Sequence, residues 1–322
     1  MVFQFYKTLV FGVRGYRNFT KQGFLRNAAK FDAADLHVDL SNRHFIVSGS
    51  NSGIGFETAR GLASLGAVVH MLCRNRERAE AARLKIIEDV PNADVRVHLA
   101  DMSCIKSVLS FAEQFRSEKW PLHGLVLNAA NHYAKRTATD EGFDASYATN
   151  VLSVFVLARE LQEAVSASSG RIIMVSSGGM LTEVLDANDL ECKNFEPWDG
   201  LKVYAKNKRA VVALAEVLAA ENAHVYSCHP GWVDTPLVQE HLPNFRKKLE
   251  GKLREPPQGA DTLVWLCAAP DAALARNGVK PGDFVFDRMP ASKSIALCGV
   301  PSASDKEKMM LKLDADFALS KL

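Results

Sequence analysis

From about residue 43 onward, short apolar runs alternate with longer segments of helical periodicity. Such short runs predict buried strands, and the longer segments predict the helices between them. The expected strands are His44–Ser48, Ala67–Leu72, Val95–Leu99, Leu125–Asn128, Ile172–Ser176 and Val225–Cys228, with Phe284–Phe286 left open as a last strand. The expected helices are Phe56–Leu65, Ser103–Phe115, Phe143–Val165, Val203–Ala220 and Gln258–Leu266. This alternation predicts an α/β fold with a Rossmann-like, doubly wound parallel sheet.

The chain has 322 residues, with no internal repeat and no low-complexity linker. A length of this order suits one large α/β domain. We therefore expect a single domain over residues 41–322, preceded by a basic amphipathic N-terminal helical extension over residues 1–40. The stretch Pro236–Pro257 is charged and irregular in pattern, and a substrate lid could lie there.

The first 31 residues contain no Asp or Glu and carry six basic residues, Lys7, Arg14, Arg17, Lys21, Arg26 and Lys30. On a helix, Lys7, Arg14, Arg17 and Lys21 share one face, and Val2, Phe5, Leu9, Val13 and Tyr16 share another. No apolar core followed by a small-residue cleavage site indicates a secretory signal. Two interpretations stay open: a helix packed on the domain, or peripheral contact with a membrane surface.

The composition excludes several classes of function. A net charge of +2 gives no support for nucleic-acid binding. The six cysteines are scattered without a CxxC pair, which favours reduced thiols, and the nine histidines show no metal-binding spacing, so no metal is expected. No apolar run reaches the length of a membrane span. We expect an intracellular, cytoplasmic protein, with peripheral membrane or mitochondrial association left open.

The first expected strand leads into a glycine-rich turn, Ser48-Gly49-Ser50-Asn51-Ser52-Gly53-Ile54-Gly55, and then a helix. Glycines let the backbone turn tightly and approach a pyrophosphate, and the helix N-terminus supplies N–H donors. This position in a strand–turn–helix unit predicts a dinucleotide site. The second strand ends without the carboxylate that would bind the ribose hydroxyls of NAD, and Arg74 stands beside that position. An arginine suits a 2′-phosphate, so NADP(H) is predicted, with NAD(H) still open.

Tyr204 and Lys208 lie four residues apart on an expected helix and therefore share a face. A phenol has a pKa of about 10, and a neighbouring ammonium is expected to lower it toward the range useful for proton transfer. Ser177 follows the preceding strand, and its hydroxyl could bond a substrate oxygen. The three residues predict hydride-transfer chemistry with a tyrosine acid/base.

Together these motifs resemble the short-chain dehydrogenase/reductase superfamily over about residues 43–290. The resemblance implies that Asp101 binds the adenine, with Met102 beside it, and that Asn128 and Ala129 lie under the adenosine ribose. It implies a catalytic set of Asn150, Ser177, Tyr204 and Lys208, the lysine also holding the nicotinamide ribose. The implied cofactor contacts are Gly49, Ser50, Asn51, Ser52, Gly53, Ile54, Gly55, Arg74, Asp101, Met102, Asn128, Ala129, Tyr204, Lys208, Pro230, Gly231, Val233 and Thr235.

Structural interpretations remain open for some of these residues. Asn150 could be a packing amide, Asp101 could also cap the next helix, and His229 is expected to be a loop histidine. The sequence departs from the family pattern at Leu127 and Ala130, and an insertion lengthens the interval between Ser177 and Tyr204.

The predicted function is NADP(H)-dependent interconversion of a carbonyl and an alcohol on a small lipophilic molecule. The pocket is expected to include Met180, Leu181 and the stretch after Thr235. A catalytically weak nucleotide-binding scaffold and a membrane-surface regulator are the alternatives. Homo-oligomer formation is left open.

Overall fold

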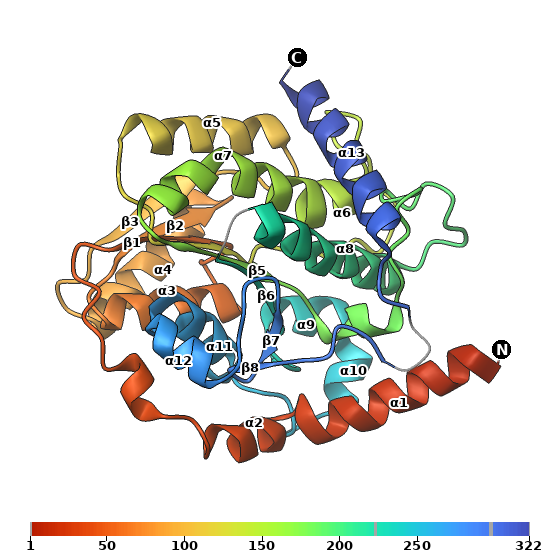
Figure 1. Ribbon diagram of the computed structural model, residues 1–322, viewed down its shortest axis with the longest axis horizontal. Coiled ribbons are helices and arrows are strands. Elements are labelled where there is room, and N and C mark those ends of the chain that lie inside the picture. Colours follow the sequence, from red (N-terminus) through yellow and green to blue (C-terminus); the bar gives the residue numbers. More distant parts are fainter. Residues whose placement is uncertain (1, 222–223, 296–298, 322) are drawn as a thin grey trace.

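A computed structural model describes residues 2–221, 224–295 and 299–321, with only the backbone for residues 2–5. Its centre is an eight-stranded sheet in the order β3-β2-β1-β4-β5-β6-β7-β8 (Figure 1). The strands are β1 (His44–Ser48), β2 (Val68–Cys73), β3 (Val95–Leu99), β4 (Gly124–Leu127), β5 (Arg171–Val175), β6 (Val225–Cys228), β7 (Phe284–Phe286) and β8 (Met289–Pro290). The first seven strands are parallel, as predicted, and β8 pairs antiparallel with β7. The Rossmann-like, doubly wound fold is therefore confirmed.

Helices cover both faces of the sheet (Figure 1). One face carries α5 (Ile105–Ser117), α7 (Ser153–Ala167), α8 (Gly200–Glu221) and α13 (Ala303–Ser320). The other carries α3 (Gly53–Ser64), α4 (Arg76–Asp89), α11 (Pro256–Ala268) and α12 (Asp271–Arg276). The remaining helical elements are α1 (Val2–Asn18), α2 (Lys21–Ala28), η1 (Ala33–Leu36), α6 (Ala145–Tyr147), η2 (Ala148–Leu152), η3 (Gly178–Thr182), α9 (Pro236–His241) and α10 (Pro243–Lys248).

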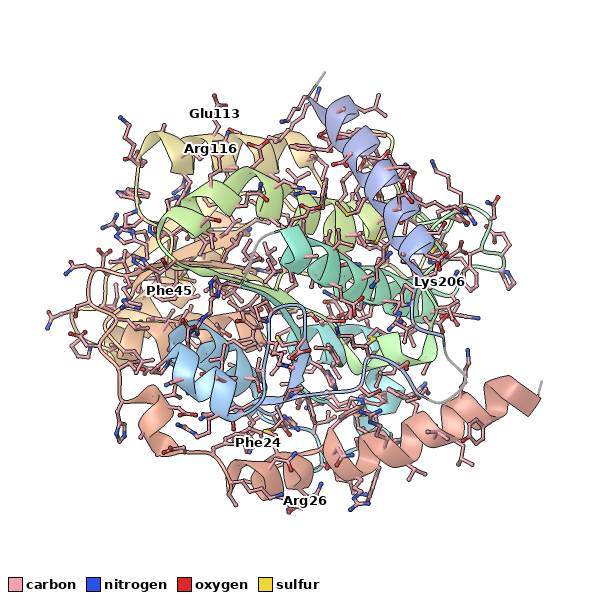
Figure 2. All side chains as sticks on the ribbon, in the orientation of Figure 1. Phe24, Arg26, Phe45, Glu113, Arg116 and Lys206 are labelled. Carbon is pink, nitrogen blue, oxygen red and sulfur yellow. The ribbon has the colours of Figure 1, made fainter. Side chains whose placement is uncertain are left out.

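The central strand β1 shows why the sheet is covered on both sides. Ile46 belongs to the apolar core on one face, and its neighbours Phe45 and Val47 belong to the core on the other. Successive side chains of a strand point to opposite faces, so an uninterrupted apolar run needs two covering layers. Figure 2 shows Phe45 among the interior side chains and Arg26 at the outer rim of the molecule.

The predicted strands agree with the structure to within one residue at each end, but several helical predictions were incomplete. The expected helix Phe143–Val165 is divided into α6, the π-helical turn η2 and α7. The stretch Pro236–Pro257 was wrongly expected to be irregular, since it forms α9, α10 and the start of α11. Thr235 caps α9 by accepting a hydrogen bond from Val238 N at 3.4 Å, and prolines open all three helices, a position where the missing N–H is harmless.

The N-terminal extension forms two helices, and their junction is integrated into the body of the protein. Phe19 is buried, its carbonyl accepts hydrogen bonds from Trp232 N and from the buried Arg254 side chain, and Gly15 packs directly against the Trp232 ring. A Cβ on Gly15 would lie 2.2 Å from that ring, so a larger residue there would displace α1.

The predicted apolar face of α1 is turned to solvent wherever its side chains are described, since Leu9, Val13 and Tyr16 are all exposed. Phe11, which was not part of the predicted face, packs toward the body of the protein instead. Lys7, expected on the basic face, is buried. The side chains of Val2 and Phe5 lie outside the described residues. In the described part of the chain, no helix is long and apolar enough to cross a membrane.

The described cysteines all carry free thiols, in agreement with the prediction of reduced cysteines. They are Cys73, Cys104, Cys192, Cys228 and Cys267, and Cys298 lies outside the described residues. Burial raises the pKa of the Cys192 thiol to about 11 and that of the Cys267 thiol to about 12, which keeps both protonated at neutral pH.

Candidate active site

The predicted site residues gather where the parallel strands end. Gly49, Arg74, Asp101, Asn128, Ser177 and Pro230 each stand within two residues of the carboxyl end of a strand, from β1 to β6 respectively. The carboxyl ends of parallel strands share one edge of the sheet, where open α/β folds bind their ligands. The fold thus brings segments that are distant in sequence to one edge.

The turn after β1 has the geometry of a nucleotide cradle. Gly49 and Gly53 have φ angles of +66° and +57°, which side chains of L-residues rarely tolerate. A Cβ on Gly55 would lie 2.4 Å from the carbonyl oxygen of Gly49, so only glycine permits this close approach. Ser50 is fully buried, with its Oγ 3.5 Å from the Cys73 sulfur, and supports the turn from beneath. A dinucleotide with a pyrophosphate fits this open, amide-rich turn at the start of α3.

Ser48 joins the glycine turn to the segment after β4. Its Oγ accepts hydrogen bonds of 3.0 Å from both Asn128 N and Ala129 N, and the Asn128 side-chain amide donates to Ser48 O at 2.9 Å. The same amide nitrogen reaches Gly49 O at 3.4 Å. The two strand ends therefore form one hydrogen-bonded unit, although Leu127 and Ala130 differ from the family motif.

Arg74 and Asp101 stand together at the ends of β2 and β3. Arg74 is largely exposed, and its guanidinium lies 3.9 Å from the Asp101 carboxylate, a weak surface pair. Asp101 accepts hydrogen bonds from Ser103 N and Ser103 Oγ at 2.8 and 2.7 Å. It does not cap α5, the alternative that the sequence left open, because the N-cap residue is Cys104 and the Glu141 carboxylate accepts from the first helical N–H groups. Met102 is buried beside Asp101. An exposed guanidinium with only a distant partner can turn toward a phosphate. The neighbouring Asp101 carboxylate is already engaged by Ser103.

Tyr204 and Lys208 lie one turn apart on α8. The Lys208 ammonium is buried, donates to Val175 O at 2.8 Å and lies 5.7 Å from the centroid of the Tyr204 ring. Burial raises the pKa of Tyr204 to about 12 and lowers that of Lys208 to about 8. The expectation that the lysine lowers the phenol pKa is therefore wrong for this structure. Loss of water around the phenol outweighs an ammonium that is itself desolvated and held by a carbonyl.

Ser177 lies at the end of β5, opposite the face of α8 that carries Tyr204. Its Oγ accepts a hydrogen bond from Gly179 N at 3.4 Å, which leaves the O–H free to donate. The neighbouring Ser176 is turned inward and donates to Lys208 O at 2.8 Å. This bond fixes α8 against β5, and with it the spacing between the serine and the tyrosine.

Asn150 is buried in the π-helical turn η2. Its side chain accepts from Asn131 N and donates to Asn131 O, both at 2.9 Å, and its amide also reaches Ser146 Oγ and Asn207 Oδ1 at 3.2 Å. π-Turns of this kind occur frequently at functional sites. The contacts show that Asn150 fixes the chain after β4, and its predicted catalytic role remains a prediction.

A cleft of about 800 Å³, hereafter the Tyr204 cleft, brings most of the predicted residues together. They are Gly49, Asn51, Ser52, Gly53, Ile54, Gly55, Asn128, Ala129, Ser177, Tyr204, Lys208, Pro230, Gly231, Val233 and Thr235. Ser50, Arg74, Asp101, Met102 and Asn150 are not in its lining. Ser50 and Asn150 are buried, and Arg74, Asp101 and the buried Met102 follow β2 and β3 at the far end of the edge.

Several residues of the cleft wall carry no signal in the sequence. Thr8 and Phe11 of α1 line the Tyr204 cleft, and the apolar wall continues through Trp232, Leu237, Leu242 and Phe245. The stretch after Thr235 had been predicted to contribute, but nothing in the sequence places α1 against η3 on the wall of this cleft. Met180 and Leu181, expected in the substrate pocket, instead belong to a buried apolar cluster with Phe19 and Phe284. They follow Ser177 into η3, whose turn directs them inward.

Comparison with known proteins agrees with this geometry. A family model described as short chain dehydrogenase matches residues 43–188. The chain belongs to the short-chain dehydrogenase/reductase family, and is thus an oxidoreductase that acts on CH–OH groups with NAD(P). Within the family it is similar to dehydrogenase/reductase SDR family member 12. The Bos taurus protein is 38% identical over 316 residues, covering 97% of this chain and 98% of its own. The Homo sapiens protein is 37% identical over 311 residues, covering 96% of each chain.

Solved structures share the fold. A short chain dehydrogenase/reductase family protein superposes with a TM-score of 0.60 at 25% identity, covering 77% of this chain and 97% of that one. L-Sorbose reductase from Gluconobacter frateurii, complexed with NADPH and L-sorbose, has a TM-score of 0.58 at 23% identity. It covers 72% of this chain and 91% of its own, and at this identity the likeness shows the fold alone.

Proposed function

We propose that this protein is an NADP(H)-dependent oxidoreductase that reduces the carbonyl of a lipophilic small molecule, or oxidises the corresponding alcohol. The observation that carries the proposal is the Tyr204 cleft. The glycine turn lies at one side of this cleft, Ser177 and Tyr204 lie at another, and an apolar wall closes a third. Aromatic side chains supply much of that wall, which favours an apolar substrate over a sugar.

Arg74 supports NADP(H) as the cofactor. It directly follows β2, where the ribose is predicted to lie, and its exposed guanidinium can form charge-assisted hydrogen bonds with a 2′-phosphate. Lys208 and Asn128 would hold the ribose rings, and the glycine turn would hold the pyrophosphate. When bound, the reduced nicotinamide supplies a hydride for the carbonyl carbon.

The protein's own groups handle the proton and the developing charge. With its pKa raised by burial, Tyr204 stays protonated at neutral pH and can donate its proton to the carbonyl oxygen. The free O–H of Ser177 can donate a second hydrogen bond to that oxygen and so orient it. The Lys208 ammonium on the next turn stabilises the phenolate that proton donation leaves behind. This arrangement favours the reductive direction, because the resting phenol is already the acid that reduction requires.

A carbonyl panel tests the proposal. Lipophilic aldehydes and ketones and hydrophilic sugars would be offered with NADPH, and cofactor oxidation would be followed by absorbance. We expect turnover of apolar carbonyls that falls by about 10²- to 10⁴-fold in Tyr204→Phe, the usual contribution of a general acid. Saturable NADPH binding without turnover of any carbonyl, equal in wild type and Tyr204→Phe, would instead identify a nucleotide-binding scaffold.

The second proposal is that α1 touches a membrane surface. Tyr6, Leu9, Val13 and Tyr16, hereafter the α1 stripe, are exposed at helical spacing on this helix. Exposed basic residues lie near the stripe: Arg17 on α1, and Lys252, whose Nζ lies 5.0 Å over the Tyr16 ring. Apolar side chains flanked by cations suit an interface with anionic lipid headgroups.

A further inference from the structure

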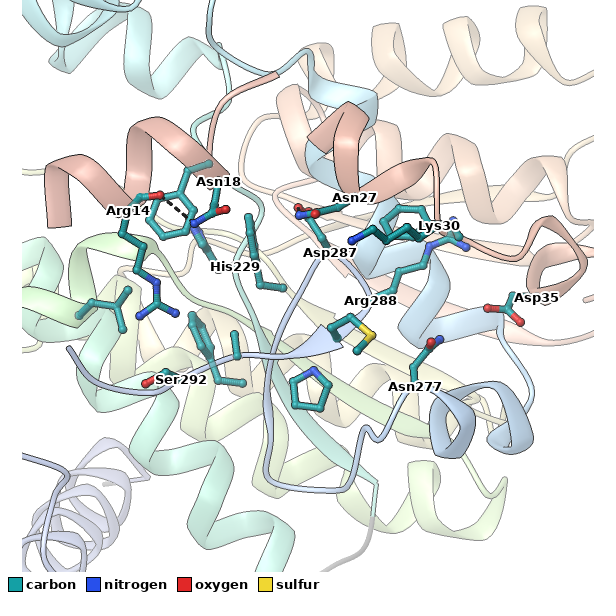
Figure 3. A pocket seen from close by; sticks show the side chains of 18 residues that line it. Arg14, Asn18, Asn27, Lys30, Asp35, His229, Asn277, Asp287, Arg288 and Ser292 are labelled. Carbon is teal, nitrogen blue, oxygen red and sulfur yellow. Dashed lines mark hydrogen bonds between the residues drawn. The ribbon is translucent and has the colours of Figure 1, made fainter. Parts of the chain in front are cut away.

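A second cavity of about 400 Å³ lies between the N-terminal helices and the chain around β7 and β8 (Figure 3). We call it the Arg14 cavity. Its described lining residues are distinct from those of the Tyr204 cleft. Much of its wall is apolar, from Phe19, Leu181, Phe284, Phe286, Met289 and Pro290. Nothing in the proposed reaction uses this space.

The acidic residues that line the Arg14 cavity are already neutralised. Asp287 forms a buried bidentate pair with Arg254, at 2.6 and 2.9 Å. Asp35 pairs with Arg276 and also accepts from Trp265 Nε1 at 2.8 Å. Both carboxylates therefore have their charges balanced by arginines, and neither is left to balance a further cation in the cavity.

Arg14 brings an uncompensated positive charge to the same cavity. Its side chain leaves α1 and points into the space, toward the segment that carries Ser292 (Figure 3). The guanidinium is half-buried, and burial lowers its pKa from the usual value. Within the described ranges, no carboxylate pairs with it. A desolvated charge without a partner is unfavourable, so a bound anion would stabilise this arrangement.

His229 lies on the wall of the same cavity and brings no charge to it. This residue was expected to be a loop histidine, but it is buried, and Phe19 and Phe286 pack around its ring. Burial and the nearby Arg254 and Arg14 charges lower its pKa well below the usual value, so the ring is neutral. Its Nδ1 accepts from Gly231 N at 3.3 Å, which leaves the proton on Nε2. That Nε2–H has no described acceptor, and the nitrogen is enclosed beside Gly178, where a Cβ would lie 2.9 Å from it.

We propose that the Arg14 cavity binds a small organic acid with an apolar body. The Arg14 guanidinium receives the carboxylate, and the neutral His229 ring contributes to the uncharged wall. The chain of the acid lies against Phe284, Phe286 and Met289. Lys30 reinforces the preference for an anion, because it is an exposed cation on the cavity rim without a described ion-pair partner.

Calorimetric titration of the full chain tests this site with three probes. Decanoate is the carboxylate with an apolar body, decanamide has the same chain without charge, and inorganic phosphate is an anion without the chain. We expect decanoate to bind saturably at one site, with decanamide and phosphate each at least tenfold weaker. Equal binding of decanoate and decanamide, or of decanoate and phosphate, would overturn the proposed ligand class.

Variants locate the binding. Arg14→Gln should weaken decanoate binding at least tenfold, whereas Arg17→Gln should change it less than twofold, since Arg17 is exposed on the same helix outside the cavity. Ser292→Trp keeps the Arg14 charge but narrows the cavity, and it should also abolish binding. This variant tests the location of the site independently if Arg14→Gln lowers the melting temperature. Decanoate binding that survives both Arg14→Gln and Ser292→Trp, or that is lost in Arg17→Gln, would refute the site.

Discussion

Lys208 has a pKa close enough to neutral pH for its charge to change within the working range of the protein. Burial lowers its pKa to about 8, so the ammonium loses its proton as the pH rises through that value. If the ammonium holds the nicotinamide ribose, the affinity for NADPH should be constant below about pH 8. Above that, it should fall by up to about tenfold per pH unit. Fluorescence titration of NADPH between pH 6.5 and 9.5 measures this dependence.

Two variants separate this role from proton transfer. Lys208→Met should weaken NADPH binding at pH 7 and lose the alkaline decline, whereas Tyr204→Phe should bind NADPH as the wild type does and lose only turnover. An alkaline decline of the same size in Lys208→Met would show that another group causes it.

Arg74 should determine the preference between the two dinucleotides. Its pair with Asp101 is long and exposed, so little is lost when the guanidinium turns to a 2′-phosphate. Arg74→Ala should weaken NADPH binding by about tenfold, roughly the worth of one charge-assisted hydrogen bond at an exposed site, and leave NADH binding nearly unchanged. Arg78→Ala, on the exposed surface of α4, is the matched control. A wild type that binds NADH more tightly than NADPH would contradict the cofactor assignment.

Among the elements, the three strands β1, β2 and β3 carry a row of histidines, in which His44 and His70 are buried and His98 is half-buried. His44 Nδ1 lies 3.0 Å from His70 Nε2, and His70 Nδ1 lies 2.9 Å from His98 Nε2, with Trp120 packed against all three rings. Burial and the neighbouring histidines lower the pKa of His70 to about 2. Hydrogen bonds between neutral rings give both nitrogens of the His70 ring a partner, so the row needs no charge.

This row should make the protein sensitive to acid. Below about pH 6.5, His70 becomes protonated in the unfolded chain but stays neutral in the folded protein. The free energy of unfolding therefore decreases as the pH is lowered. Between pH 6.5 and 5, this one group should remove about 2 kcal/mol, at about 1.4 kcal/mol per pH unit. Urea denaturation from pH 7.5 to 5 should therefore show a shallower acid slope in His70→Phe than in the wild type, even if that variant is less stable throughout. The exposed His37→Gln is the control and should keep the wild-type slope; identical slopes in all three proteins would refute the assignment.

Elements were predictable where local sequence and tertiary environment agree. The strand β1 is an apolar run and is buried on both faces, so the pattern sufficed. The helix α4 was missed because only Ala79, Ala82 and Ile86 of its fourteen residues are buried, too narrow an apolar stripe to stand out among its charges. The site residues on strand ends could be predicted from turn chemistry. The sequence could not predict the surroundings of Phe11, Trp232 and His229. These depend on how α1 packs across the strand ends, and no local pattern indicates that contact.

At the scale of the whole molecule, α1 contributes one face to the Tyr204 cleft and exposes another face to solvent. Phe11 and Thr8 line the Tyr204 cleft, while the α1 stripe looks outward from the same helix. The junction with α2 is fixed by Arg254, which donates to Asn18 O at 2.9 Å and Phe19 O at 3.1 Å. Removal of residues 1–31 would therefore uncover Trp232 and Phe286 and leave buried donors of Arg254 without partners. We expect such a deletion to lower the melting temperature, so it cannot test membrane contact cleanly.

Surface substitutions on α1 provide the cleaner test of membrane contact. Leu9 and Val13 are 54% and 64% exposed, so Leu9→Gln/Val13→Gln should leave the melting temperature within a few degrees of the wild type. If these side chains enter the acyl boundary, the double variant should bind anionic liposomes roughly ten- to a hundred-fold more weakly, since each buried apolar side chain contributes about 1.5 kcal/mol or more. Leu311→Gln, at an equally exposed leucine on α13, should sediment with the same vesicles as the wild type does.

Because α1 also lines the Tyr204 cleft, vesicle-bound wild type should turn over a membrane-partitioned carbonyl faster than the double variant does, with equal rates on a water-soluble one. A wild type that ignores phosphatidylserine vesicles at low salt would eliminate this role for the α1 stripe and leave α1 as a wall of the cleft alone.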